Sequence, residues 1–258
     1  MTLGDFSEQA AAYGRTRPGY PQALLVRLLD QLGVRAGAHV VDLGAGTGLF
    51  TRLLAEAGMR VTAVEPCQAM RHEAPLLANV NWIDGTFERT GLADSSQDWA
   101  VAAHSFHWAQ PAKALPEIKR ILSPNGHFTI VVNERDTDGS SVLTWTTLKL
   151  KNLVPEYEGG LRRLDWAAIL RSTGDFGEVQ YLDVCHMQSM TCDHYLELWR
   201  SQNRLTTIAG SQRLDVFLHA LKGYLFRQHP DGVEIPYVSR AWTARRLEPA
   251  VFEGITPE

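Results

Sequence analysis

The residues best suited to chemistry lie where an apolar run gives way to a segment with helical spacing. Glycines occupy alternate positions at this junction, namely Gly44, Gly46 and Gly48, and the run before them ends in Asp42. A turn this abrupt needs backbone angles that residues with a Cβ avoid, and a ligand on the turn needs main chain without side chains in the way. A second apolar run ends at Glu65, 21 positions after Gly44, where a carboxylate can accept both hydroxyl groups of a ribose. The spacing therefore predicts a strand, a tight turn and a helix that together bind a nucleoside.

The glycine spacing, G-x-G-x-G, differs from two other nucleotide-binding patterns. Leu49 occupies the place of the third glycine in the dinucleotide fingerprint G-x-G-x-x-G, and the Gly-Lys-Ser/Thr of a P-loop is missing. The stretch from Asp42 to Gly48 resembles motif I of the class I S-adenosylmethionine (SAM) dependent methyltransferases. The alternative is a glycine-rich turn without a ligand. The resemblance implies SAM as cofactor and the following binding residues: Asp42, Gly44, Ala45, Gly46, Glu65 and Pro66.

The N-terminal pattern F…Y-x-x-x-R-P-x-Y-P resembles a branch of this family, that of the methyltransferase type 11 and trans-aconitate methyltransferase-like proteins. In that branch the segment folds over the SAM site. The resemblance implies that Tyr13 and Arg17 contact the cofactor and that Phe6 and Tyr20 face the substrate. The alternative is that the aromatic residues pack a helix onto the core while Arg17 forms a surface ion pair.

Three later segments resemble the same branch. The form E-P-x-x-x-M implies that Met70 lies against the adenine, and the stretch after the third strand implies adenine contacts from Thr86 and Phe87. A motif ending in F-H-W after the fourth strand implies that His104 contacts the methionine part of SAM, mainly through its backbone, and that His107 and Trp108 face the substrate. Core packing is the alternative for Met70.

Methyl transfer from a sulfonium needs little acid–base machinery, because holding a nucleophile in line at ~3 to 3.5 Å supplies most of the acceleration. His107 is the one group near the expected methyl position that could take a proton near neutral pH, although it could also be a hydrogen-bonded wall residue. Asn133 and Tyr157 could hydrogen-bond the acceptor. The alternative for each is a structural role, in capping an element or in packing. A carboxylate acceptor could be oriented by bidentate bonds from Arg135, Arg162 or Arg163, which could equally be solvated surface charges.

Composition limits the classes of protein that fit. The 258 residues suit one large α/β domain, and 45% hydrophobic content is ample for a core. The net charge of −4 with scattered Lys and Arg predicts a small-molecule substrate, with neither nucleic acid nor membrane as a partner. Three cysteines without C-x-x-C spacing argue against disulfides or a metal site. With no basic leader and no apolar run near ~18 residues, we expect a cytoplasmic protein that is a monomer or a homodimer.

The fold expected is α/β: a Rossmann-like, seven-stranded, mostly parallel sheet with helices on both faces and an inserted helical cap. We expect N-terminal lid helices over 1–35, a SAM-binding core over 36–135, the cap and a linker to strand six over 136–175, and C-terminal strands with substrate-side helices over 176–258. Within these segments the pattern predicts helices at 22–32 and 111–121 and strands at 80–83, 97–103, 127–133, 179–186 and 233–245. Pro236 within the last strand suits an edge or irregular position.

Several functions are compatible with these features. The first is a SAM-dependent methyltransferase acting on a small acceptor through a carboxylate, O or N nucleophile. A cyclase that displaces methylthioadenosine from SAM to form a cyclic amino acid, and a SAM-binding protein without turnover, are the alternatives. A nicotinamide oxidoreductase is disfavoured by Leu49.

Overall fold

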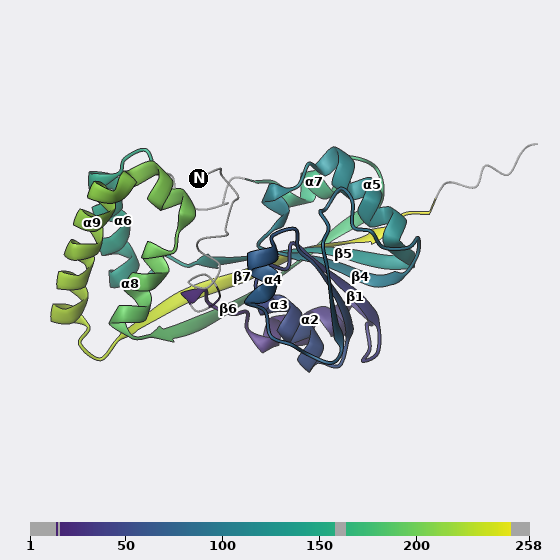
Figure 1. Cartoon of the computed structure of the whole chain (residues 1–258), viewed down its shortest axis with the longest axis horizontal. Helices are drawn as coiled ribbons and strands as arrows, with labels where there is room; N and C mark the ends of the chain where they lie inside the picture. Colours follow the sequence, from purple (N-terminus) through teal and green to yellow (C-terminus); the bar gives the residue numbers. More distant parts are fainter. Residues whose placement is uncertain (1–13, 15, 158–163, 249–258) are drawn as a thin grey trace, which may run out of the picture.

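A single twisted sheet organises the computed structural model, which describes residues 14, 16–157 and 164–248. Its seven strands run in the order β3-β2-β1-β4-β5-β7-β6, and the pairs up to β4–β5 are parallel while those made by β7 are antiparallel. Figure 1 shows the sheet passing between layers of helices. This is the α/β architecture that the sequence predicts. The strands are β1 (His39–Leu43), β2 (Arg60–Val64), β3 (Val80–Ile83), β4 (Gln97–Ala103), β5 (Leu122–Arg135), β6 (Phe176–Met190) and β7 (Val233–Arg246).

Helices cover both faces of the sheet because each carries an apolar stripe. Leu24 and Leu28 of α2 pack with Leu54 of α3 against one face, while α5 and α7 cover the other with Ile118 and Leu170. Burial of such stripes drives helix docking at roughly 25 cal/mol per Å² of apolar surface. The helices that cover the sheet or follow its strands are α2 (Gln22–Leu32), α3 (Leu49–Glu56), α4 (Gln68–His72), the short 3-10 helix η1 (Phe106–Trp108), α5 (Pro111–Ile121) and α7 (Trp166–Arg171).

A second hydrophobic core lies beyond the end of the sheet. Helices α6 (Ser141–Leu153), α8 (Cys192–Arg200) and α9 (Asn203–Gln228) bury a cluster of their own that includes Tyr195 and Phe217. In Figure 1 these three helices form a separate lobe, here called the cap lobe, carried on the extended ends of β6 and β7. Two insertions therefore build the lobe, one after β5 and one between β6 and β7.

Strand lengths depart from the sequence prediction where the sheet reaches the cap lobe. β6 and β7 stay paired as far as Met190 and Val233, well past the last pair of β5, Arg135 with Tyr237. An antiparallel pair can continue as a two-stranded ribbon because each strand satisfies the backbone groups of the other. At the start of β5, pairing with β4 shifts after Leu122 and resumes at His127, so the regular part begins where the sequence predicts.

Pro236 shows how an interior strand tolerates a proline. β7 lies between β5 and β6, so it is not an edge strand as a whole. The position of Pro236, however, is one residue past the last pair with β5, where its carbonyl accepts a bond from the Asp136 N–H at 2.8 Å. The residue lacks an N–H, and here no neighbouring strand requires one.

Candidate functional site

The glycine turn connects β1 to α3 and is hydrogen-bonded to the carboxyl end of β2. Gly44, Gly46 and Gly48 all have positive φ angles, of 66°, 59° and 83°. The N–H groups of Gly44 and Ala45 both donate to the Val64 carbonyl, at 2.8 and 3.1 Å, which fixes the turn on the neighbouring strand. Left-handed angles cost an L-residue roughly 1–2 kcal/mol, so glycine is required at these positions.

Two of these glycines meet different surroundings. A Cβ on Gly44 would lie 2.8 Å from the Ser105 Cβ and 2.9 Å from the Phe87 ring, so close packing excludes any side chain there. A Cβ on Gly46 would meet nothing within 4 Å. The main chain at Gly46 is therefore open for a ligand, as the sequence argument expects.

Glu65 lies next to the turn, at the end of β2. Its carboxylate accepts hydrogen bonds from the Gly46 N–H at 2.9 Å and from the Cys67 N–H at 2.8 Å. Burial raises the pKa of Glu65, and the two N–H donors oppose that rise. A carboxylate has about four lone-pair positions, so two remain for further donors such as ribose hydroxyls.

Asp42 is buried beneath the turn. Its Oδ2 accepts a bond from the Thr51 hydroxyl at 2.6 Å, while Oδ1 has no hydrogen-bond partner among the described residues. Burial raises the pKa of Asp42 to about 7, with the Thr51 hydrogen bond acting against it. A cation nearby would favour the ionised form, so this carboxyl is suited to the positive end of a ligand.

The candidate adenine side is formed by α4 and the loop after β3. Met70 is buried and Phe87 packs edge-on against Phe106, with ring centroids 5.5 Å apart. The backbones of Thr86 and Arg89 exchange hydrogen bonds of 3.0 and 3.3 Å, which closes a tight loop. Pro66, directly after Glu65, is exposed.

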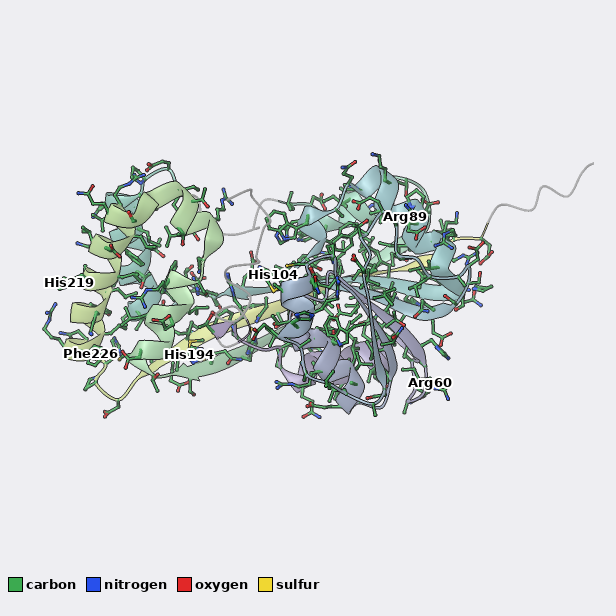
Figure 2. All side chains as sticks on the ribbon, viewed as in Figure 1. Arg60, Arg89, His104, His194, His219 and Phe226 are labelled. Carbon is green, nitrogen blue, oxygen red and sulfur yellow. The ribbon has the colours of Figure 1, made fainter. Side chains whose placement is uncertain are left out.

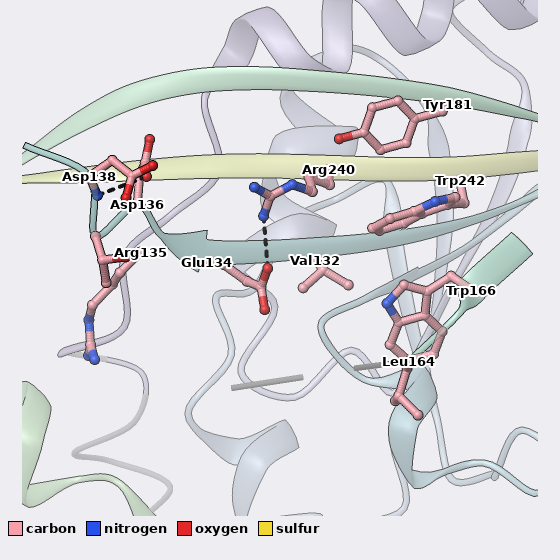
Figure 3. A pocket seen from close by; sticks show the side chains of 11 residues that line it. Val132, Glu134, Arg135, Asp136, Asp138, Leu164, Trp166, Tyr181, Arg240 and Trp242 are labelled. Atoms are coloured by element: carbon pink, nitrogen blue, oxygen red, sulfur yellow. Dashed lines mark hydrogen bonds and ion pairs between the residues drawn. The ribbon is translucent and has the colours of Figure 1, made fainter. Parts of the chain in front are cut away.

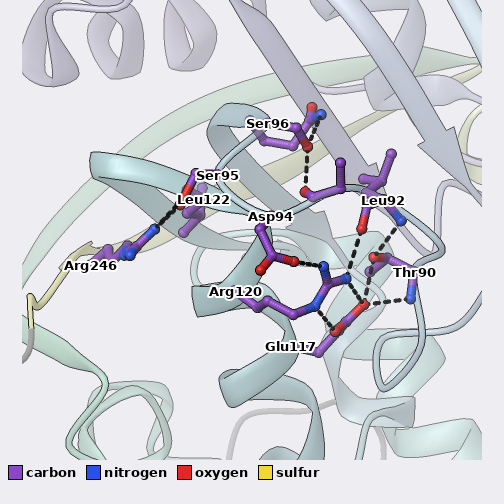
Figure 4. A network of polar contacts seen from close by, with 11 residues as sticks. Thr90, Leu92, Asp94, Ser95, Ser96, Glu117, Arg120, Leu122 and Arg246 are labelled. Carbon is purple, nitrogen blue, oxygen red and sulfur yellow. Dashed lines mark hydrogen bonds and ion pairs between the residues drawn. The ribbon is translucent and has the colours of Figure 1, made fainter.

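A polar network fixes this loop to α5 (Figure 4). The Glu117 carboxylate accepts bonds from the Thr90 N–H at 2.9 Å, from the Thr90 hydroxyl at 2.7 Å and from Arg120 at 2.7 Å. These bonds, with that of Arg120 the strongest, lower the pKa of Glu117 to about 2. The loop that carries Thr86 and Phe87 is thus held by charge-assisted bonds from a helix.

The end of β4 places two histidines at the edge of the sheet core facing the cap lobe, where Figure 2 labels His104. His104 has a positive φ of 56°, and its Nδ1 accepts a bond from the Asn133 N–H at 3.3 Å. Its ring lies 5.9 Å from that of His107, which in turn lies 4.7 Å from Trp108. Burial lowers the pKa of His104 to about 3 and that of His107 to about 4, so both rings are neutral at pH 7.

The cap side of the site gathers side chains from several elements. The Arg135 guanidinium lies over the Trp199 ring, 4.1 Å from its centroid, and its Nε donates to the Tyr237 hydroxyl at 3.2 Å. The Tyr157 hydroxyl donates to Gln202 at 2.9 Å, and the charge of Arg135 acts on it. The charge of Arg135 thus reaches the Tyr157 hydroxyl, and a role for the two residues in holding an acceptor stays a prediction.

Asn133 is committed to bonds within the protein. Its Nδ2 donates to the Gly19 carbonyl at 3.2 Å, and its Oδ1 accepts from the Ser239 hydroxyl at 3.0 Å and contacts His186 Nε2 at 3.2 Å. Both ends of the amide are in use, so the geometry favours positioning over direct contact with an acceptor.

The N-terminal segment supplies Arg17 and Tyr20. The charge of Arg17 lowers the pKa of His104, an effect secondary to burial, and the Tyr20 ring packs edge-on against Phe50 with centroids 5.0 Å apart. Other predicted residues lie outside the described part of the chain, namely Phe6, Tyr13, Arg162 and Arg163.

Comparison with known proteins shows which family this chain is similar to. Residues 41–130 match the methyltransferase domain family. An uncharacterized methyltransferase of Mycobacterium tuberculosis is 41% identical over 133 residues, which is 51% of this chain and 53% of that protein, so the match spans about half the length of this curated relative. An uncharacterized methyltransferase-like protein of Schizosaccharomyces pombe is 26% identical over 263 residues, covering 97% of this chain and 98% of its own.

Solved structures share the fold. A candidate type II methyltransferase from Anaeromyxobacter dehalogenans superposes with a TM-score of 0.67 at 24% identity, over 90% of this chain and 99% of that one. The match over residues 41–130 and the shared fold make this chain similar to the class I SAM-dependent methyltransferases. Another fold relative, phosphoethanolamine N-methyltransferase 2 of Haemonchus contortus, was solved with SAM and has a TM-score of 0.53 at 18% identity, over 96% of this chain and 58% of that one.

SAM is the cofactor of this methyltransferase family, and the described residues fit it. The open main chain at Gly46, the spare acceptor positions of Glu65 and the unpartnered Oδ1 of Asp42 lie at one end of neighbouring strands. These features suit a nucleoside that carries a positive charge. The fit rests on contacts within the chain and does not depend on Phe6 or Tyr13.

The sequence analysis did not predict several hydrogen bonds at the site between residues that lie far apart in the sequence. Ser105 donates to the Leu43 carbonyl at 2.7 Å, which locks the end of β4 to the glycine turn. His186 and Ser239 meet Asn133 only because β5, β7 and β6 are adjacent. Asn133 of β5 and Ser239 of β7 are paired across the two strands. A prediction of that strand register would have placed these two side chains together.

A pocket of about 460 Å³ lies beside β5, where Val132 and Glu134 line it (Figure 3). Its walls include the aromatic side chains of Trp166, Tyr181 and Trp242. Beside them Arg240 forms an ion pair with Glu134, with a guanidinium nitrogen 2.8 Å from a carboxylate oxygen. The Arg135 side chain points away from these groups in Figure 3. The predicted cofactor residues do not line this pocket.

The described ranges hold neither a metal-binding cluster nor a membrane-spanning helix. Within 14, 16–157 and 164–248, no group of three or more His, Cys, Asp or Glu side chains is arranged to hold a metal ion. No helix among these residues is long and apolar enough to span a bilayer.

Proposed function

We propose that the protein transfers the methyl group of SAM to a small-molecule acceptor bound between the sheet core and the cap lobe. The observation that carries this proposal is the convergence at the ends of β1, β2 and β4 of an open glycine backbone, a carboxylate with spare acceptor positions and a buried aspartate. Ligands of open parallel sheets bind at this edge.

The roles of the cofactor residues follow from their chemistry. Glu65 would accept the ribose hydroxyls, Met70 with the Thr86–Phe87 loop would hold the adenine, and Asp42 would balance positive charge at the methionine end. SAM supplies a methyl group that is already activated by its sulfonium. The residues of the chain then need only to orient the acceptor and exclude water.

The acceptor side favours a molecule with an anionic group. A guanidinium can hold a carboxylate by two parallel bonds, and Arg135 is fixed by Trp199 and Tyr237 where it can do so. His107 is a weak base because burial lowers its pKa to about 4. A carboxylate acceptor is already ionised at pH 7 and needs no base, whereas an alcohol or amine acceptor would need a better one.

Product analysis tests the proposal. The protein is incubated with SAM and a panel of small carboxylic acids, alcohols and amines, and S-adenosylhomocysteine is quantified by mass spectrometry. We expect S-adenosylhomocysteine above background with a member of the acid set. Methylthioadenosine formed from SAM alone would instead identify the cyclase, and binding of SAM without either product would identify a protein that only binds it.

A further inference from the structure

Gly14 and residues 16–20 of the N-terminal segment contact both the glycine turn and the cap lobe. At its start, a Cβ on Gly14 would lie 3.5 Å from the Thr47 side chain of the glycine turn. The Thr16 hydroxyl and the Ser201 hydroxyl of the cap lobe are 3.0 Å apart, and the Thr16 carbonyl is 3.1 Å from His194 Nε2. The described N-terminal residues therefore touch the glycine turn on one side and the cap lobe on the other.

One side chain fastens the middle of this segment to the sheet. The Asn133 Nδ2 donates to the Gly19 carbonyl across 114 residues of sequence, at 3.2 Å. A backbone carbonyl can only accept, so the bond requires the N–H of the amide. Arg17 is two residues before Gly19, and its charge reaches His104, so this bond sets the position of a predicted cofactor contact.

The orientation of the Asn133 amide is fixed from its other side. The Ser239 hydroxyl donates to Oδ1 at 3.0 Å, and His186 Nε2 lies 3.2 Å from the same oxygen. Gln188 Nε2 is 3.3 Å from His186 Nδ1, which suits a ring whose Nε2 carries the proton. With Oδ1 occupied by donors, Nδ2 must point toward Gly19.

We propose that Asn133 is a positioning residue that holds segment 16–20 closed over the bound cofactor and so sets how fast the cofactor leaves. The inference rests on the proposed function, because it takes the cofactor to bind beneath this segment. Asn133 need not touch the cofactor or the acceptor. Its role is carried by one donated hydrogen bond, worth about 1 to 1.5 kcal/mol, or roughly a tenfold change in rate.

Stopped-flow fluorescence and calorimetry with S-adenosylhomocysteine test the inference on the full chain. In Asn133→Ala we expect the dissociation rate to rise about tenfold, the association rate not to fall, and the stoichiometry to stay at one per chain. Asn133→Asp keeps the acceptor atoms for Ser239 and His186 but cannot donate to Gly19 when ionised, so we expect the same faster release. A general loss of structure would instead lower the stoichiometry.

Ser239→Ala is the matched control, because it removes one of the two donors to the Asn133 Oδ1 while His186 Nε2 still fixes the orientation of the amide and the Gly19 link is kept. We expect its dissociation rate to stay within twofold of the unmodified protein. The inference is overturned if Asn133→Asp releases the ligand at the unmodified rate, or if Ser239→Ala releases it as fast as Asn133→Ala. If the unmodified protein binds no S-adenosylhomocysteine, the proposed function fails first.

Discussion

The glycines of the turn serve two different purposes, which substitution separates. Gly44→Ala places a Cβ 2.8 Å from Ser105 at a φ of 66°, so we expect a loss of about 2 to 4 kcal/mol in the free energy of unfolding. In Gly46→Ala the new Cβ meets open space, so the only cost is that of a left-handed φ of 59°, and we expect the free energy of unfolding to fall by about 1 kcal/mol. We expect binding of S-adenosylhomocysteine to weaken at least about tenfold. Urea unfolding and calorimetry measure the two effects. Equal loss of stability in both variants would contradict this division.

The buried Asp42 predicts an unusual dependence of stability on pH. Its pKa is about 7 in the folded protein against a model-peptide value of 3.8, so the folded state holds the proton over the range in which the unfolded state has lost it. The free energy of unfolding should therefore fall as pH rises from about 4 to about 7, by at most roughly 4 kcal/mol. Denaturant titrations of the ligand-free protein and of Asp42→Asn across this range test the point. Because Asn is neutral at every pH, Asp42→Asn should lack this fall, so its free energy of unfolding should rise relative to that of the unmodified protein as pH increases, and a constant difference would refute it.

At single residues, the sequence carries a clearer signal for the predicted cofactor side than for the predicted acceptor side. Asp42, the glycines and Glu65 are close in sequence and have spacing that steric and hydrogen-bonding rules explain. Asn133 carries no such local signal, because its partners Gly19, His186 and Ser239 lie 114, 53 and 106 residues away. A contact between Asn133 and the acceptor stays a prediction. Both ends of its side-chain amide are hydrogen-bonded within the protein, which favours the positioning role.

Among the elements, the loop after β3 depends on a carboxylate of α5. Glu117→Gln should weaken the bonds to Thr90 and Arg120 and lower the free energy of unfolding by about 1 to 2 kcal/mol, after allowance for solvent screening. The pKa of Glu117 is lowered to about 2, so its contribution is present above about pH 4.5 and is lost as pH falls toward 2. Urea titrations at pH 7 and pH 3 check this. The two proteins should differ less at the lower pH, and an equal difference would contradict the assignment.

Predicted bounds were correct for elements that end at strong local signals. The helices Gln22–Leu32 and Pro111–Ile121 match, since Gly33 terminates one and Pro111 begins the other. Strands β5 and β6 extend beyond the prediction because tertiary pairing with β7 continues past the apolar alternation. The apolar spacing predicts a helix over 212–226, whereas helix α9 begins earlier, at Asn203, and passes through a kink at Gly210.

For the whole molecule, the division into two lobes predicts separate effects on cofactor and acceptor. Arg135 lies on the cap side, against Trp199 and Tyr237. Arg135→Gln should lower kcat/KM for an acidic acceptor about 10- to 100-fold, as expected for loss of a charge-assisted hydrogen bond. The dissociation constant for S-adenosylhomocysteine should stay within twofold. A loss of cofactor affinity as large as the loss in kcat/KM would place Arg135 in the wrong half of the site.

The seven-stranded, mostly parallel α/β sheet was predictable, because a motif and the alternation of strands and helices indicate it. The arrangement of the cap lobe was harder to predict. The sequence predicts one inserted helical segment, whereas α6 buries its apolar face against α8 and α9, which follow some 40 residues later. Apolar periodicity shows that a helix needs a partner and does not say which one.

Titration calorimetry of the protein with S-adenosylhomocysteine, alongside Glu65→Gln, tests the central claim most directly. Glu56→Gln, at an exposed ion pair on α3, gives the same change in charge as a control. The account predicts binding of one ligand per chain, weakened about 10- to 100-fold in Glu65→Gln and unchanged in Glu56→Gln. Absence of binding at millimolar ligand, or equal affinity in the unmodified protein and Glu65→Gln, would contradict it.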